Sequence, residues 1–142
     1  MEIHFNVAGY EHYMKNVMKT LACPNNDYDL SKSELMDFYG LDERVYQYDN
    51  NSFNADLVPD QNNIHDKNAI KIVVDDLVVG YVKKGSVSKV KKLMEDPKYL
   101  YSAVELKGGK YKLLWEDEDE KVHLEKGELP YSVHLYVFME GD

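Results

Sequence analysis

Several features that define other protein classes are scarce in this 142-residue sequence. Cys23 is the only cysteine, which excludes a disulfide framework within the chain and a cysteine-based zinc site. No stretch approaches the roughly 20 apolar residues that a bilayer-spanning helix needs. The segment Met1 to Asn6 lacks the basic and apolar parts of a secretory signal peptide. We therefore expect a cytoplasmic protein with no membrane partner.

Basic residues are also few relative to acidic ones. The chain has 17 Lys and Arg against 26 Asp and Glu, a formal charge of −9. Broad binding to nucleic acid needs Lys and Arg that neutralise phosphates, so a protein that coats DNA is excluded. Residues 66–98 differ, because they hold eight lysines against five acids and leave −12 for the rest. Only a narrow nucleic-acid site fits this distribution.

The remaining composition is that of a globular protein. Apolar residues make up 44% and charged residues 30%, and there are 12 tyrosines. A chain of this length buries roughly two-thirds of its unfolded surface, so its core needs no disulfide or metal. We expect one domain over residues 1–142, with no metal and no cofactor.

Hydrophobic periodicity predicts the elements of the first half. Alternating apolar residues indicate a strand, spacings of three and four indicate a helix, and Ser31 with Glu34 fits a capping box. The predicted elements are a strand around residues 3–7, helices over residues 10–21 and 31–39, and strands over residues 45–48 and 53–58.

The second half is richer in strands. Asp75-Asp76 is typical of a tight reversal between two β-branched runs, and Lys107-Gly108-Gly109-Lys110 is typical of a hairpin turn. The acidic run at 116–120 repels itself and predicts a solvated loop. The predicted elements are strands over residues 69–74, 77–82, 100–106, 111–115 and 131–137, and a helix over residues 86–95.

Strands outnumber helices, and they do not follow the regular alternation of a parallel sheet. We therefore expect an α+β, β-rich fold, a small barrel of about six strands with two or three helices. Residues 25–52 are expected as an insertion, and residues from about 96 as a β-rich C-terminal extension.

Three segments together resemble the HIRAN domain family. They are the run from Leu57 to Ile72 with its polar, asparagine-containing loop and Asp66-Lys67-Asn68-Ala69-Ile70, the step Val79-Gly80-Tyr81-Val82-Lys83-Lys84, and Val7-Ala8-Gly9. HIRAN domains occur in helicase-like chromatin and DNA repair proteins, and alone in bacteria and phages. The resemblance implies an OB-like or SH3-like barrel that holds the 3′ end of single-stranded DNA.

The resemblance also implies roles for individual residues. Asp66 matches the loop aspartate that accepts the 3′-hydroxyl, His65 and Tyr81 stand at positions of ring contact, and Lys84 stands where a lysine contacts phosphate. Glu11 replaces an arginine of the family pattern. The nucleic-acid-binding residues expected on this basis are Tyr10, His12, Tyr13, Asn63, His65, Asp66, Tyr81 and Lys84.

The residues themselves leave structural alternatives open. Asp66 can fix the loop through backbone amides, and the tyrosines can pack in the barrel. Five lysines lie in residues 83–92 with no acid among them. They fit the rim of a groove, and they also fit a solvated helix face.

Three functions remain at this stage. The first is a non-catalytic module that binds a single-stranded DNA end, with a separate helicase or nuclease as a protein partner, since the chain has no ATP-binding Gly-x-x-x-x-Gly-Lys motif. The second is a protein-interaction module, such as an acidic phage or mobile-element accessory protein, which Glu11 and the net charge favour. A hydrolase built on His65 and Asp66 ranks last.

Overall fold

The computed structural model describes residues 1–141, and the chain folds as two compact units. Unit 1 consists of residues 1–22, 51–107 and 132–141, and unit 2 consists of residues 23–50 and 108–131. The prediction treated residues 25–52 and the C-terminal extension as separate additions. In the structure, most of the insertion and part of the extension together make unit 2.

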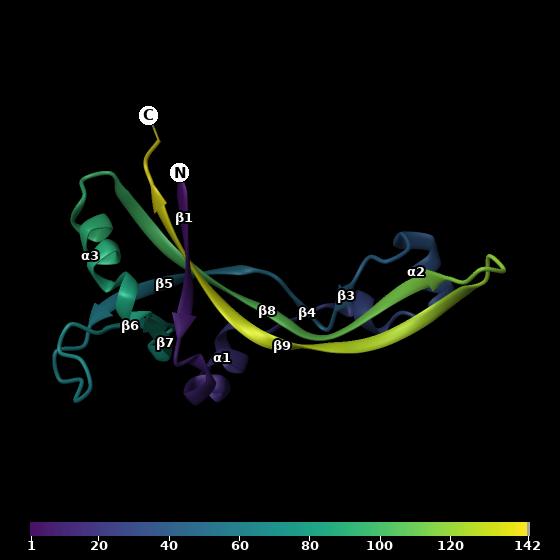
Figure 1. Ribbon diagram of the computed structural model, residues 1–142, viewed down its shortest axis with the longest axis horizontal. Coiled ribbons are helices and arrows are strands. Elements are labelled where there is room, and N and C mark those ends of the chain that lie inside the picture. Colours follow the sequence, from purple (N-terminus) through teal and green to yellow (C-terminus); the bar gives the residue numbers. More distant parts are fainter. Residues whose placement is uncertain (142) are drawn as a thin grey trace. The chain divides into compact units, whose positions relative to one another are not determined.

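Unit 1 contains a closed antiparallel barrel (Figure 1). Its strands have the order β8-β5-β6-β7-β1-β9, and a further pairing of β8 with β9 closes them into six strands. The same sheet has β3 as an extra strand, which pairs with the part of β8 that lies in unit 2. This confirms the predicted β-rich α+β barrel. The strands are β1 (Glu2–Ala8), β5 (Ser52–Pro59), β6 (Ile70–Val74), β7 (Leu77–Val82), β8 (Tyr99–Glu116) and β9 (Val122–Met139).

The barrel core comes from the alternation that predicted its strands. Successive side chains of a strand point to opposite faces, so apolar residues at every second position enter one interior. Phe5 and Val7 of β1 are buried in this way, as are Ile70, Ile72 and Val74 of β6. The Asp75-Asp76 reversal between β6 and β7 is also observed, with both residues at positive φ (48° and 66°).

Two helical segments of unit 1 follow strands directly. The predicted helix at residues 10–21 begins as the 3₁₀ helix η1 (Tyr10–Tyr13) and continues as α1 (Met14–Leu21), which buries Val17 and Leu21. The predicted helix at residues 86–95 is α3 (Val87–Glu95), preceded by the 3₁₀ helix η3 (Lys84–Ser86). Both segments therefore begin where β1 and β7 end.

Unit 2 has a small core of its own. Leu35, Val45 and Leu114 are buried together, with Tyr39, Val122 and other partly buried side chains around them. The predicted capping box is present, since Ser31 and Glu34 exchange both hydrogen bonds at the start of α2. The elements confined to unit 2 are β2 (Cys23–Pro24), η2 (Asn26–Asp29), α2 (Lys32–Phe38), β3 (Val45–Tyr46) and β4 (Tyr48–Asp49).

The predicted hairpin turn at Gly108-Gly109 is wrong. Both glycines lie inside the continuous strand β8, at φ of 92° and 91°. A Cβ on Gly108 would lie 2.2 Å from the Pro130 carbonyl oxygen, and one on Gly109 would lie 2.5 Å from Cε1 of Tyr131. The glycines therefore permit close contact with β9 within unit 2, and they do not reverse the chain.

The reversal between β8 and β9 lies in the acidic run instead. Residues 117–120 are a loop, as predicted, whereas Glu116 is the last residue of β8; the loop forms the turn of the hairpin visible in Figure 1. Asp117 organises it, because one of its carboxylate oxygens accepts from the amides of Asp119 and Lys121 at 2.8 and 3.0 Å. Consequently β9 begins at Val122, well before the predicted strand at residues 131–137.

The predicted strand at residues 45–48 is also different. It is two separate two-residue strands, because β3 pairs with β8 whereas β4 pairs with β2. None of the helices within residues 1–141 combines the length and the apolar character that crossing a bilayer requires.

Candidate functional site

The main cavity of unit 1 has a volume of about 530 Å³. It lies among η1, the loop that joins β5 to β6, the end of β7 and the start of η3. Seven of the eight residues that the sequence singled out line it, and they come from segments far apart along the chain. They are His12, Tyr13, Asn63, His65, Asp66, Tyr81 and Lys84.

The loop of residues 60–69 is closed by its own hydrogen bonds. The amide of Asp60 donates to the carbonyl of Ala69 at 2.8 Å, which ties the two ends of the loop. The side-chain oxygen of Asn63 accepts from the amides of His65 and Asp66 at 2.9 and 3.0 Å. Asn63 therefore sets the direction of both residues at the cavity, a role for which Asn is suited.

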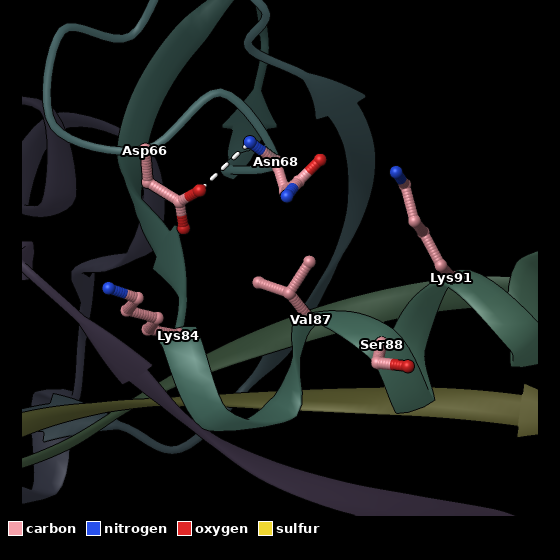
Figure 2. A pocket seen from close by; sticks show the side chains of 6 residues that line it. All are labelled: Asp66, Asn68, Lys84, Val87, Ser88 and Lys91. Atoms are coloured by element: carbon pink, nitrogen blue, oxygen red, sulfur yellow. Dashed lines mark hydrogen bonds between the residues drawn. The ribbon is translucent and has the colours of Figure 1, made fainter.

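Of the two roles considered for Asp66, the structure contains the structural one. One carboxylate oxygen accepts from the amide of Asn68 at 2.9 Å, so Asp66 does organise the turn (Figure 2). The other oxygen has no hydrogen-bond partner among residues 1–141. The side chain is partly buried and lines the cavity. One acceptor is thus available to a ligand while the loop stays fixed.

Two tyrosine rings form an aromatic wall of the cavity. Tyr13 and Tyr81 are half-buried, and their ring centroids are 6.1 Å apart at an interplanar angle of 51°. The Tyr81 hydroxyl donates to the carboxylate of Asp60 at 3.0 Å, which links β7 to the loop. Burial raises the pKa of Tyr81, and hydrogen bonds with Tyr13 and Asp60 raise it further. Tyr81 is therefore a neutral, oriented ring.

Gly80 explains how Tyr81 reaches this position. A Cβ on Gly80 would lie 2.5 Å from the Val7 side chain and 3.0 Å from the Ala8 carbonyl oxygen. A β-bulge interrupts the register of β6 with β7 just before it, between Ile72 and Val73. Close approach to β1 and a bulge in β7 are thus both present at this glycine. They bring Tyr81 opposite Ala8 of β1.

The mouth of the cavity is polar. His12, His65 and Lys84 are exposed and line it. The two imidazole rings make no hydrogen bond within residues 1–141, and no ion pair there joins Lys84 to Asp66. These side chains can therefore turn toward a ligand at little energetic cost.

A second cavity of about 350 Å³ adjoins the first, and Asp66 and Lys84 line both. Figure 2 shows Asp66 and Asn68 on the loop facing Val87 of α3, with Lys84 and Lys91 on either side. Lys91 belongs to the lysine cluster of residues 83–92 but was not among the expected site residues. Ser88 and Asn68 also line this cavity and were missed, because nothing in the sequence brings the loop against α3.

Tyr10 is the one selected residue that does not line the cavity. Burial raises the pKa of its hydroxyl, and the charge of Glu11 and a hydrogen bond with it add to the effect. Glu11 is exposed and lines neither cavity. Its negative charge is therefore outside the lining of the site, next to Tyr10.

The described residues give no sign of a metal centre. Within residues 1–141, no three His, Cys, Asp or Glu side chains are grouped so that they could hold a metal ion.

No family model, curated protein or solved structure matches the chain significantly.

Proposed function

We propose that unit 1 binds the free 3′ end of single-stranded DNA in the two adjoining cavities, without catalysis of its own. The observation that carries the proposal is Asp66. Asp66 lines both cavities together with aromatic rings and lysines, and one of its carboxylate oxygens is available for a further hydrogen bond. A carboxylate accepts a hydrogen bond from a hydroxyl and repels a phosphate in the same place. A terminal hydroxyl is thus the group that fits it.

The rings of the main cavity support the binding of unpaired bases. Tyr13 and Tyr81 present half-buried aromatic surface, and His65 adds a smaller ring at the mouth. Stacking contributes roughly 1–3 kcal/mol per base and is tolerant of sequence. We therefore expect binding of a few terminal nucleotides with little base preference.

The lysines support a phosphate path from one cavity to the next. Lys84 lines both cavities and Lys91 lines only the second one. Two such contacts match a short strand, in keeping with the net charge of the chain. A separate helicase or nuclease would supply any reaction on the DNA, as the HIRAN resemblance implies.

The test compares Asp66→Asn with the unmodified protein. Asparagine keeps an acceptor for the Asn68 amide but loses the negative charge, so the loop is retained. Fluorescently labelled oligonucleotides that end in a 3′-hydroxyl or a 3′-phosphate are titrated and followed by anisotropy. A hydrogen bond to a charged group contributes roughly 1.5–3 kcal/mol. We expect the hydroxyl end to bind about tenfold or more tightly, and Asp66→Asn to abolish that preference.

Asp76→Asn is the matched control, since Asp76 is exposed in the β6–β7 turn and lines neither cavity. It should bind like the unmodified protein. Equal affinity for both ends in the unmodified protein would remove Asp66 from the mechanism. No binding of either oligonucleotide at low salt would overturn the proposal.

A further inference from the structure

The negative charge of the chain is concentrated in unit 2. Its residues, 23–50 and 108–131, hold 14 acids against six Lys and Arg, a formal charge of −8. The rest of the chain therefore carries only −1 of the total of −9. A surface that repels nucleic acid is thus built into one compact unit.

Unit 2 also has an apolar groove, of about 240 Å³. Met36, Tyr39 and Leu41 line it from α2 and the residues that follow, and Leu114 and Val122 line it from β8 and β9. Met36 is 49% exposed and Leu41 is 46% exposed, although both are large and apolar. A partner that covered these side chains would remove apolar surface from water, which favours binding.

The groove is held in shape by its surroundings in unit 2. Leu35 of α2 is buried beneath it with Leu114, and the Asp42 amide donates to the Leu114 carbonyl at 2.7 Å. The Tyr39 hydroxyl donates to Asp27, which raises the pKa of Tyr39 to about 12. The backbone that carries the exposed apolar side chains is therefore held in place by packing and hydrogen bonds within unit 2.

Acidic residues accompany the groove on both of its chain segments. Glu116 lines it directly, and the acidic run continues through residue 120. On the other segment, Asp37, Asp42 and Glu43 are exposed, and Glu43 accepts from the amide of Gly40, a lining residue, at 3.1 Å. Arg44 lies over the ring of Tyr111, 4.9 Å from its centroid. The groove is thus lined mostly by apolar side chains, with the carboxylate of Glu116 among them and further acidic residues next to them in the sequence.

We infer that this groove docks a basic amphipathic segment of a protein partner. Its apolar side chains would enter between Met36, Leu41 and Leu114, and its Lys or Arg side chains would meet the surrounding carboxylates. A second copy that met the groove with its own unit 2 would bring a like-charged surface, and nucleic acid would bring phosphates, so both are disfavoured. This inference is independent of the proposed DNA end site, which lies in unit 1.

The probe is a synthetic, fluorescently labelled peptide of leucine and lysine, with the leucines at helical spacing. It is titrated against the full chain at low and moderate salt, and its anisotropy is measured. We expect the unmodified chain to bind this peptide. The double variant Met36→Ser, Leu41→Ser should bind it about tenfold or more weakly, because two apolar contacts are lost. Glu116→Gln should reduce the salt dependence. Leu100→Ser, at a 56% exposed leucine of unit 1, should change nothing.

The alternatives give different results. Absence of peptide binding, or equal binding by the Met36→Ser, Leu41→Ser variant, would overturn the inference. Equal binding of a lysine peptide without leucines would reduce the groove to a charged surface and overturn it as well. If the unmodified chain sediments as a dimer and this variant as a monomer, the occupant is a second copy. Thermal unfolding of each variant verifies that it is folded.

Discussion

At the scale of single residues, two aspartates of the 60–69 loop make hydrogen bonds that hold the main cavity in shape. Asp66 lines this cavity, and Asp60 bonds to Tyr81, which lines it. Asp60 accepts from the Tyr81 hydroxyl, and Asp66 accepts from the Asn68 amide. Hydrogen bonds to charged groups contribute roughly 1.5–3 kcal/mol. These bonds hold the loop in one conformation without a ligand, and such order would reduce the entropy lost in the proposed binding of a DNA end.

His134 of β9 gives unit 1 a dependence on pH. Its ring bonds to His4 at 2.7 Å and to Ser132 at 2.8 Å. Burial lowers the pKa of His134, Lys107 and His4 lower it further, and only Glu105 acts in the opposite direction. The folded state therefore favours the neutral ring. As the pH falls below about 6.5, the usual pKa of histidine, the unfolded state binds the proton first.

We therefore expect the free energy of unfolding to fall with pH below about 6.5 and to level off below the folded pKa of His134. Urea unfolding at a series of pH values measures this, and His134→Gln should reduce the slope. His12→Gln is the control, because the His12 ring makes no hydrogen bond within residues 1–141. Equal slopes for the two variants would contradict the assignment.

The sequence was most informative where a residue type has one local use. Asn and Asp in the loop bond neighbouring amides, and these bonds are what direct His65 and Asp66. The hydrogen bond from Tyr81 to Asp60 could not be predicted, because it joins two residues 21 positions apart. The prediction that Tyr10 lines the cavity was wrong for a similar reason. The spacing of tyrosines along η1 does not determine which ring faces the loop.

At the scale of elements, β8 is the strand that local patterns misjudged most. Gly-Gly between two apolar runs is typical of a hairpin turn. In β8 the same pair is needed because backbone and ring atoms of β9 occupy the space of its Cβ atoms. That requirement arises from a strand more than 20 residues away, and no local pattern contains it. The acidic run, in contrast, was correctly predicted as a loop from Asp117 on, because self-repulsion is a local property.

Gly108→Ala tests the continuous form of β8. The added Cβ would lie 2.2 Å from the Pro130 carbonyl oxygen, at a backbone φ of 92° that alanine rarely adopts. A strained φ alone costs about 1–3 kcal/mol, and the overlap with backbone adds to it. We expect Gly108→Ala to lower the free energy of unfolding by about 2 kcal/mol or more in urea titrations.

Gly85→Ala is the matched control, because nothing lies within 4 Å of its Cβ position. It should change stability little. If Gly108→Ala were as stable as Gly85→Ala, the strand would not continue through residue 108 beside Pro130. A turn at residues 107–110 would then be the better description.

At the scale of the whole molecule, composition gives the total charge of the chain but not how that charge is divided between unit 1 and unit 2. The barrel followed from strands that alternate in sequence, since each buries one face in a shared interior. The two units did not follow, because unit 2 joins residues 23–50 to residues 108–131. Once they are separated, unit 1 has a nearly balanced charge. The net acidity of the chain therefore does not exclude a short DNA contact in unit 1.

The number of such contacts is measurable as a salt dependence. For single strands, the logarithm of the association constant falls with that of salt concentration with a slope of about −0.7 per neutralised phosphate. Lys84 and Lys91 are the lysines that line the two cavities, so we expect a slope of about −1.4, and about −0.7 for Lys91→Gln. Lys19→Gln is the control, because Lys19 is exposed on α1 and lines neither cavity, and its slope should be unchanged. A slope of about −3 or steeper, or one that Lys91→Gln leaves unaltered, would mean that phosphates bind diffusely over many lysines.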